Sequence, residues 1–154
     1  MAIEIERKFL VKDNNWRGVE GTRFRQGYLN REIDRTVRVR IAGDHGFITI
    51  KGKTTKATRP EFEYEIPLKD AEEMLDTLCL RPLIEKTRYL VEFEGAIFEV
   101  DEFTGENSGL VIAELELNTE SQPFPKPDWL GEEVTNDPRY FNSNLVKNPY
   151  SRWR

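Results

Sequence analysis

Apolar and polar side chains alternate along most of this chain, a pattern that is typical of β-strands. Successive side chains of a strand point to opposite faces, so a period of two indicates one apolar face and one polar face. We expect strands near residues 2–11, 22–31, 35–42, 46–53, 59–67, 83–94, 96–104 and 110–118. Apolar positions with helical spacing predict one helix over about 68–80 and another over about 137–146.

The polar faces of these strands are densely ionised. Glu4, Glu6 and Lys8 share one face of the first expected strand, and Glu114 shares a face with Glu116 in the last. Cationic strands lie between them, with the same-face residues Arg38, Arg40, Lys51, Lys53, Lys86 and Arg88. An open sheet could show such faces to water, whereas a closed antiparallel barrel gathers both signs of charge around one axis. The barrel explains more, and its apolar outer faces then need cover from helices or from a partner subunit, as in a homodimer.

Paired carboxylates on one strand face indicate a bound cation. Same-face neighbours such as Glu4 and Glu6 lie only about 7 Å apart, so their charges repel unless a cation lies between them. Mg²⁺ and Mn²⁺ are hard cations that prefer oxygen ligands. The candidate metal ligands are therefore Glu4, Glu6, Glu114 and Glu116, with Asp101 as a fifth ligand or a supporting group.

Several charged motifs occur together in a fixed order along the chain. They are Glu4-x-Glu6-x-Lys8, Arg38-x-Arg40, Thr49-x-Lys51-Gly52, Arg59-Pro60-Glu61-Phe62-Glu63, Lys86-x-Arg88, Asp101 and Glu114-x-Glu116. With this order and spacing, residues 2 to about 146 resemble the CYTH superfamily of triphosphate tunnel metalloenzymes. The resemblance implies a mainly β fold, an eight-stranded antiparallel closed barrel with a few peripheral helices, whose lumen binds a triphosphate and metal ions. Known members include inorganic, thiamine and RNA triphosphatases and class IV adenylate cyclases.

The resemblance and the side-chain chemistry together assign expected roles in that lumen. Arginine can donate two hydrogen bonds to phosphate oxygens, which suits it to a substrate clamp. The expected clamp residues are Arg38, Arg40, Lys51, Lys53, Lys86 and Arg88. By resemblance, Glu61 and Glu63 hold the basic residues in place. Lys8 either binds phosphate as a cation or, if neutral, activates water, and Tyr28 either hydrogen-bonds Lys8 or packs as an aromatic residue.

Length and composition are consistent with a single domain over residues 1–154. Charged residues make up 33% of the chain, but an aromatic content of 11% argues against disorder. The net charge of −5 would ordinarily argue against a polyanionic ligand, but the cations are expected to concentrate in the lumen and the acidic surplus outside it. No apolar run approaches the roughly 18 residues of a membrane span, and no signal segment is visible. These features favour a cytoplasmic protein without a membrane or nucleic-acid partner.

The single cysteine and the single histidine do not suggest nucleophilic catalysis. Cys79 lies on the apolar side of the first expected helix, where a buried structural thiol is favoured, and it can form no intrachain disulfide. His45 lies in the turn Gly43-Asp44-His45-Gly46. Ser/His/Asp and Cys/His mechanisms therefore have no support.

Two classes of function remain open, an enzyme with two variants and a non-enzymatic binding module. The preferred one is metal-dependent hydrolysis of inorganic triphosphate, or a related triphosphate, to pyrophosphate and phosphate, because the segment from Glu4 to Val11 resembles short bacterial inorganic triphosphatases most. An adenylate cyclase of the class IV type would use the same tunnel, but no residue set is assignable to an adenine pocket. A non-enzymatic polyphosphate or nucleotide-binding module would not need four carboxylates.

Overall fold

The computed structural model describes residues 3–153, which form nine strands and two α-helices together with short 3₁₀ turns. The strands are β1 (Ile3–Val11), β2 (Gly21–Tyr28), β3 (Thr36–Ala42), β4 (His45–Lys51), β5 (Thr58–Ile66), β6 (Ile84–Phe93), β7 (Ala96–Thr104), β8 (Val111–Glu116) and β9 (Leu130–Glu133). The helices are α1 (Leu68–Thr77) and α2 (Asn142–Lys147). All eight expected strands are present. Residue 2, where the first of them was expected to begin, lies outside the described residues.

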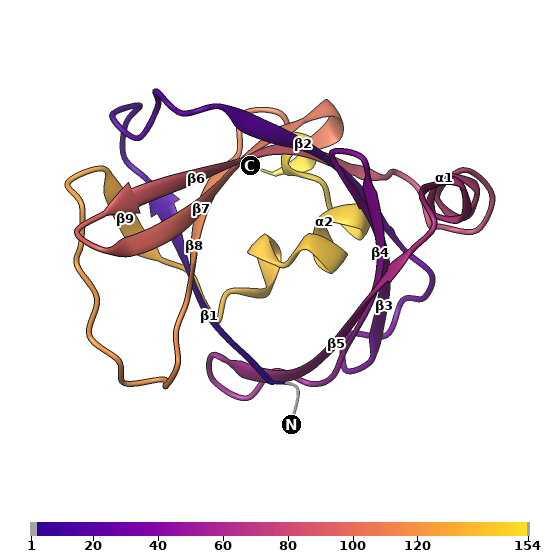
Figure 1. Ribbon diagram of the computed structural model, residues 1–154, viewed down its shortest axis with the longest axis horizontal. Helices are drawn as coiled ribbons and strands as arrows, with labels where there is room; N and C mark the ends of the chain where they lie inside the picture. The colour runs from indigo at the N-terminus through magenta and orange to yellow at the C-terminus, as the bar shows by residue number, and fades with distance from the viewer. Residues whose placement is uncertain (1–2, 154) are drawn as a thin grey trace.

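Eight of the strands close into an antiparallel barrel in the order β5-β4-β3-β2-β6-β7-β8-β1 (Figure 1). The first and last strands of this order, β5 and β1, pair with each other and close the ring. In this pairing Glu4 of β1 lies opposite Arg59 of β5. The same β1 pairs with β8 over Glu6–Leu10, and its end pairs with β9. The expected closed barrel is therefore confirmed, and β9 is an additional short strand outside the ring.

The strand register brings the ionised faces together inside the barrel. Lys8 of β1 lies opposite Glu114 of β8, and Glu114 also lies opposite Glu99 of β7. On the other side of β7, Asp101 lies opposite Arg88 of β6. Because side chains alternate between the two faces of each strand, every second residue along these strands points into the lumen.

Three apolar clusters pack against the barrel, the first and third on its outer face and the second at the end of the lumen that the C-terminal segment covers. One packs Phe9, Phe98 and Trp129 beneath the segment after β8, and a second packs the C-terminal segment against β6–β8. In the third, α1 lies on β3 and β4 with Leu75 fully buried and Cys79 beside it. The close approach of α1 depends on Gly46, because a Cβ atom there would lie 2.7 Å from the Cβ of Ala71.

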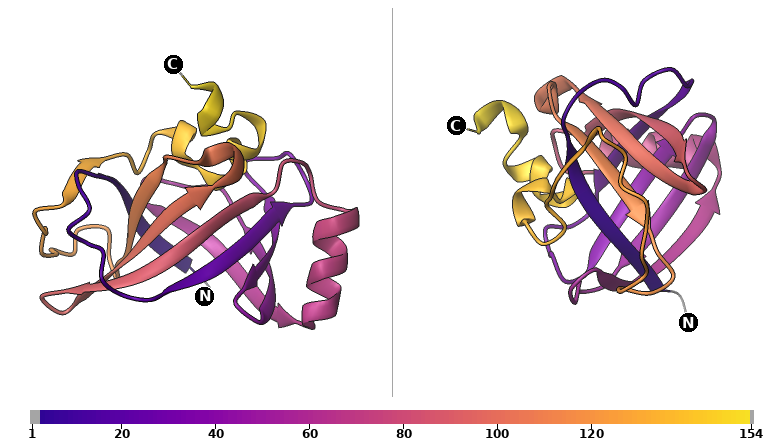
Figure 2. Two further views of the ribbon diagram at one scale, coloured as in Figure 1. Left: turned by 90° about the horizontal axis from the view of Figure 1, so that it is seen from above. Right: turned by 90° about the vertical axis from the view of Figure 1, so that its left-hand side faces the viewer.

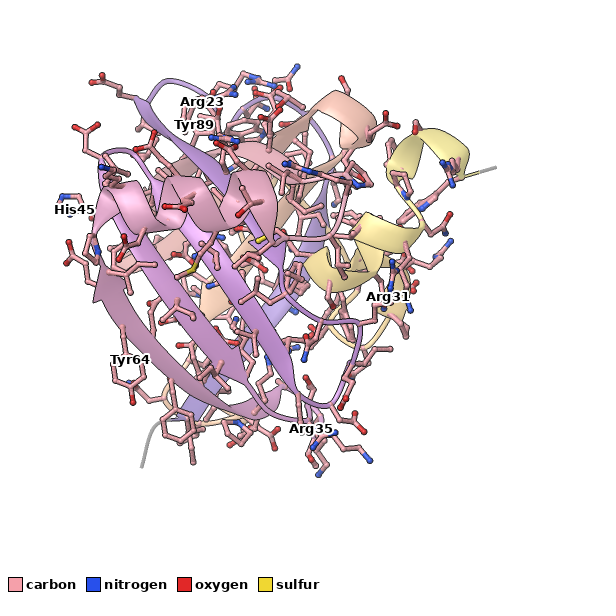
Figure 3. All side chains as sticks on the ribbon, turned by 90° about the vertical axis from the view of Figure 1, so that its right-hand side faces the viewer. Arg23, Arg31, Arg35, His45, Tyr64 and Tyr89 are labelled. Carbon is pink, nitrogen blue, oxygen red and sulfur yellow. The ribbon has the colours of Figure 1, made fainter. Side chains whose placement is uncertain are left out.

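Part of the outer face of β4 and β5 has no such cover. Ile50, Phe62 and Tyr64 are 42–58% exposed on these strands. Figure 3 shows α1 lying over one part of this face, with Tyr64 on the part that α1 leaves open. Among residues 3–153, no helix combines the length and the apolar character that crossing a membrane requires.

The C-terminal segment differs from the single helix expected over 137–146. A 3₁₀ turn covers Pro138–Tyr140, Phe141 has extended backbone with ψ 130°, and only then does α2 begin at Asn142. The expectation of one continuous helix was therefore wrong. The interruption lets the segment bend over one end of the barrel, and α2 lies across the ring of strands (Figures 1 and 2).

Candidate active site

One cavity in the barrel lumen collects most of the residues expected at a functional site. The expected residues that line it are Glu4, Glu6, Lys8, Tyr28, Arg38, Arg40, Lys51, Glu61, Glu63, Lys86, Arg88, Glu114 and Glu116. The cavity has two sides of opposite charge. The acidic wall consists of Glu4, Glu6, Glu99, Glu114 and Glu116 on β1, β7 and β8, and the cationic wall consists of Arg38, Arg40, Lys51, Lys86 and Arg88 on β3, β4 and β6.

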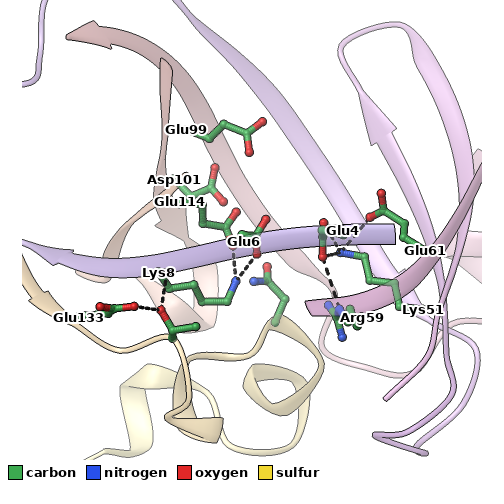
Figure 4. Close-up of polar contacts among 12 residues, drawn as sticks. Glu4, Glu6, Lys8, Lys51, Arg59, Glu61, Glu99, Asp101, Glu114 and Glu133 are labelled. Carbon is green, nitrogen blue, oxygen red and sulfur yellow. Dashed lines mark hydrogen bonds and ion pairs between the residues drawn. The ribbon is translucent and has the colours of Figure 1, made fainter. Parts of the chain in front are cut away.

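The acidic wall can hold divalent metal. Its carboxylates form two groups, Glu4–Glu6–Glu116 and Glu6–Glu99–Glu114, and within each group one oxygen per residue lies within 4.8 Å of the others. Glu6 belongs to both groups and lies between them on β1 (Figure 4). Oxygen donors from three carboxylates suit a hard cation. The sequence analysis missed Glu99, although it shares the lumen face of β7 with Asp101.

The electrostatics at three carboxylates of the acidic wall favour the addition of positive charge. Burial and the neighbouring carboxylate of Glu114 raise the pKa of Glu6. Burial, together with Glu4 and Glu6, raises the pKa of Glu116. Burial is also the main cause that raises the pKa of Glu99 to about 7. Crowding and burial thus destabilise the charged forms of these carboxylates, and a divalent cation between them would stabilise those forms. Their oxygen atoms are the ligands that a hard divalent cation prefers.

Lys8 lies within the acidic wall. Its Nζ donates to Glu6 Oε1 at 3.1 Å and to a Glu114 carboxylate oxygen. Burial acts to lower the pKa of Lys8, but the carboxylates of Glu114 and Glu6 outweigh it and raise the pKa. Among the described residues these carboxylates, and not Tyr28, bond the ammonium group, and Tyr28 lines the cavity nearby. These neighbours favour the charged form of Lys8.

The residues of the cationic wall on β3 and β4 are held by groups on β4, β5 and β1. Arg38 donates to Thr49 Oγ1 at 3.2 Å, and Thr49 in turn donates to Glu63 Oε1 at 2.9 Å. Lys51 Nζ lies 3.2 Å from a carboxylate oxygen of Glu4 and 3.2 Å from one of Glu61. Glu61 and Glu63 thus lie where the supporting role expected for them requires.

Arg40 also lies in the cationic wall, and its bond is to a neutral group. Its Nε donates to Gln26 Oε1 at 2.8 Å, and its guanidinium carbon lies 4.7 Å from the centre of the Phe24 ring. Burial, followed by the positive charges of Arg38 and Arg88, lowers the pKa of Arg40 to about 9. A polyanion in the cavity would relieve this crowding of like charges.

Asp101 holds the two remaining residues of the cationic wall and does not line the cavity. It accepts from Lys86 Nζ at 2.7 Å and from Arg88 Nε and Nη2 at 2.8 and 2.9 Å. Its side chain is only 1% exposed. Of the two roles expected for Asp101, these contacts match the supporting role. Burial lowers the pKa of Lys86 to about 7, although Asp101 opposes that shift.

Lys53 does not join the site, whereas Arg59 does. Lys53 was expected in line with Lys51, but β4 ends at Lys51 and Lys53 is exposed outside the cavity lining. Because β4 ends at Lys51, the alternation of faces no longer applies to Lys53. Arg59 lines the cavity with its Nε 3.4 Å from Glu4 Oε1. The sequence analysis did not assign Arg59 to the site, although its spacing of two residues from Glu61 would have placed it on the same strand face.

Known proteins resemble this chain over most of its length. The family description "CYTH domain" matches residues 2–150. An inorganic triphosphatase of Acetivibrio thermocellus is 54% identical over 155 residues, which covers 100% of this chain and 99% of that protein. An inorganic triphosphatase of Nitrosomonas europaea is 39% identical and covers 93% of this chain and 96% of its own length. The crystal structure of an inorganic triphosphatase, 36% identical, has a TM-score of 0.67 and covers 92% of this chain and 96% of that chain.

Proposed function

Because this chain belongs to the CYTH family, we propose that it is a metal-dependent hydrolase that converts inorganic triphosphate to pyrophosphate and phosphate. The observation that carries the proposal is one cavity in the barrel lumen in which an acidic wall faces a cationic wall. A chain of three phosphates needs cations along its oxygens, and a metal that bridges phosphate to protein needs carboxylates beside it. The cavity offers both within one lumen.

The cationic wall would bind the phosphate oxygens. Arg38, Arg40 and Arg88 can each donate from a planar fork, and Lys51 and Lys86 add point charges. Their partners on neighbouring strands fix them before substrate arrives, so little reorganisation is needed as charge develops on the oxygens. The clamp therefore holds the anion and stabilises the transition state with the same side chains.

The acidic wall would hold Mg²⁺ or Mn²⁺. The residues placed to bind such an ion are Glu4, Glu6, Glu99, Glu114 and Glu116. A divalent cation there neutralises phosphate charge and makes water more acidic. Direct attack by water is consistent with the positions of Cys79, which is buried beside α1, and His45, which is exposed at the start of β4. Neither lines the lumen, and phosphoryl transfer to water requires no covalent intermediate.

Product analysis tests the proposed reaction directly. The purified protein is incubated with inorganic triphosphate and, separately, with ATP, each with Mg²⁺ or Mn²⁺, and the products are resolved by chromatography. We expect phosphate and pyrophosphate from triphosphate, formed faster than any product from ATP, and no cyclic AMP. A suitable control is Glu72→Gln, which changes an exposed carboxylate on α1 and should leave the rate unchanged.

Two results would contradict the proposal. Cyclic AMP and pyrophosphate as the main products from ATP would identify a cyclase. Tight triphosphate binding without turnover, whichever divalent metal is added, would identify a binding module.

A further inference from the structure

The C-terminal segment sends one side chain into the lumen. Asn142, the first residue of α2, lines the cavity together with the clamp residues. Its Oδ1 accepts from Lys86 Nζ at 3.1 Å and from Gln26 Nε2 at 3.1 Å. One amide oxygen of the C-terminal segment therefore joins two strands of the barrel wall, β6 and β2.

The contact continues from Gln26 to a second clamp residue. Gln26 is fully buried, and its Oε1 accepts from Arg40 Nε at 2.8 Å. Gln26 thus donates toward Asn142 with its amino group and accepts from Arg40 with its carbonyl group. This orientation of the Gln26 amide is the one that satisfies both neighbours, so the position of Asn142 is transmitted to Arg40.

We propose that Asn142 is a positioning residue that sets the geometry of two phosphate-binding side chains, Lys86 directly and Arg40 through Gln26. The inference rests on the proposed function, because it assigns these two cations to the binding of triphosphate. Asn142 acts through other residues, which distinguishes it from the clamp residues themselves.

A neutral acceptor suits this role better than a carboxylate would. Asp101 and Asn142 each accept one hydrogen bond from the Lys86 ammonium, which has three donors, so one N–H is left for a phosphate oxygen. Likewise, the Nε of Arg40 is bonded to Gln26, and its two terminal nitrogens are left for the anion. An amide orients these cations without cancelling their charge, whereas a second carboxylate beside Lys86 would weaken anion binding.

The attachment of the segment itself depends on other residues. Leu145 and Val146 of α2 are buried in the same cluster as Ile84 and Phe103, so apolar packing anchors the helix to the barrel. Asn144 provides a matched comparison on the same helix. Its Nδ2 donates to Pro138 O at 2.8 Å, a bond within the C-terminal segment that does not reach the lumen.

The test measures anion binding separately from turnover. Inorganic triphosphate is titrated calorimetrically into wild type, Asn142→Ala, Gln26→Leu, the double variant and Asn144→Ala, in EDTA so that no hydrolysis occurs. Gln26→Leu removes the hydrogen bond between Gln26 and Asn142 by a change in β2 and leaves α2 unaltered. The inference therefore stays testable if Asn142→Ala folds poorly. Melting temperatures accompany each titration, and KM and kcat are measured with Mg²⁺.

We expect Asn142→Ala and Gln26→Leu each to weaken triphosphate binding about tenfold and to raise KM more than they lower kcat. The double variant should bind no more than about twofold weaker than Asn142→Ala, because the loss of Asn142 already removes the contact that orients Gln26. Asn144→Ala should bind within about twofold of wild type.

Several outcomes would overturn the inference. Asn142→Ala could bind triphosphate as tightly as wild type does, or Asn144→Ala could lose as much affinity as Asn142→Ala. The affinity losses of the two single variants could also multiply in the double variant. A wild-type protein that binds triphosphate without hydrolysing it would refute the proposed reaction and leave this test intact. A wild-type protein that does not bind triphosphate would overturn both.

Discussion

The two walls of the lumen are built in opposite ways. In the cationic wall each charge has a partner that fixes it, as Asp101 fixes Lys86 and Arg88 and as Gln26 fixes Arg40. In the acidic wall the carboxylates converge on one another within 4.8 Å, and burial together with their mutual repulsion raises the pKa of Glu6. The cations of one wall have partners within the protein, whereas the other wall keeps three carboxylates, Glu6, Glu99 and Glu116, whose raised pKa values favour an added cation.

This difference separates stability from activity. Removing a partner from the cationic wall leaves a buried charge without compensation, which costs folding free energy. Removing Glu6 from the acidic wall relieves repulsion, so its loss should impair metal binding and catalysis and not stability. Four substitutions test this contrast, in order of decreasing expected effect.

Asp101→Asn should give the largest loss of stability. It removes the carboxylate that compensates Lys86 and Arg88, and breaking a buried ion pair in this way costs about 3 kcal/mol or more. Urea denaturation in EDTA measures the free energy of unfolding, with the exposed Asp70→Asn on α1 as the control. A change within the error of the control would show that the cationic wall does not depend on this carboxylate.

Glu6→Gln should abolish most activity without loss of metal-free stability. Glu6 belongs to both carboxylate groups, so its loss should lower kcat by about 100-fold or more, the scale seen when a major source of transition-state stabilisation is removed. The melting temperature in EDTA should stay constant or rise, because repulsion with Glu114 is relieved. Near-normal Mg²⁺-dependent activity would remove Glu6 from the metal site, and a stability loss like that of Asp101→Asn would break the contrast between the walls.

Arg40→Lys tests whether the clamp needs geometry as well as charge. Lysine keeps the positive charge but loses the planar fork and the Nε bond to Gln26. We expect kcat/KM for triphosphate to fall at least about tenfold, which corresponds to roughly 1.4 kcal/mol. Arg152→Lys changes an exposed residue near the C-terminus and should be silent. Equal behaviour of the two variants would exclude Arg40 from the clamp.

Glu133→Gln should have the smallest effect, because its ion pair lies outside the lumen. Arg7 Nε donates to Glu133 at 2.8 Å, and this hydrogen bond lowers the pKa of Glu133 below its ordinary value. A carboxylate with a lowered folded-state pKa stabilises the fold above its unfolded-state pKa of about 4.3, and this contribution is lost as pH falls through the folded-state value. The two side chains are 25% and 35% exposed, so the contribution should be under about 1 kcal/mol.

Urea denaturation of wild type and Glu133→Gln at neutral pH and near pH 3 measures this contribution. The difference should be present at neutral pH and vanish in acid. Glu132→Gln, at the exposed neighbouring position, is the control. A difference that grows toward acid would contradict the ion pair as its source.

The sequence predicted the barrel well because the period of two is a local property of each strand. It allowed the lumen face of β3 to be identified from Arg38 and Arg40 alone. The same rule failed at Lys53, where the strand had already ended and a face could no longer be extrapolated. It also missed β9, whose four residues include a glycine and pair only with the end of β1.

Pairings between distant segments account for what the sequence left open. Glu99 and Asp101 share a strand face, and only the register of β7 with β8 and β6 brings Glu99 into a carboxylate group and Asp101 against two cations. Asn142 lies more than 50 residues from Lys86, and no periodic pattern could place it in the lumen. The break at Phe141 that makes this possible lies in a segment whose apolar positions had predicted one continuous helix.

The path of β1 has a consequence for how the protein is made. Glu4 pairs with Arg59, but Glu6–Leu10 pair with Ile112–Glu116, about a hundred residues later in the chain. During synthesis from the N-terminus, β1 therefore has to wait for β8 before it can complete its pairing. Contacts of such long sequence separation form late and slow the folding rate. The nascent chain thus carries its first acidic residues long before the polypeptide that completes their surroundings has left the ribosome.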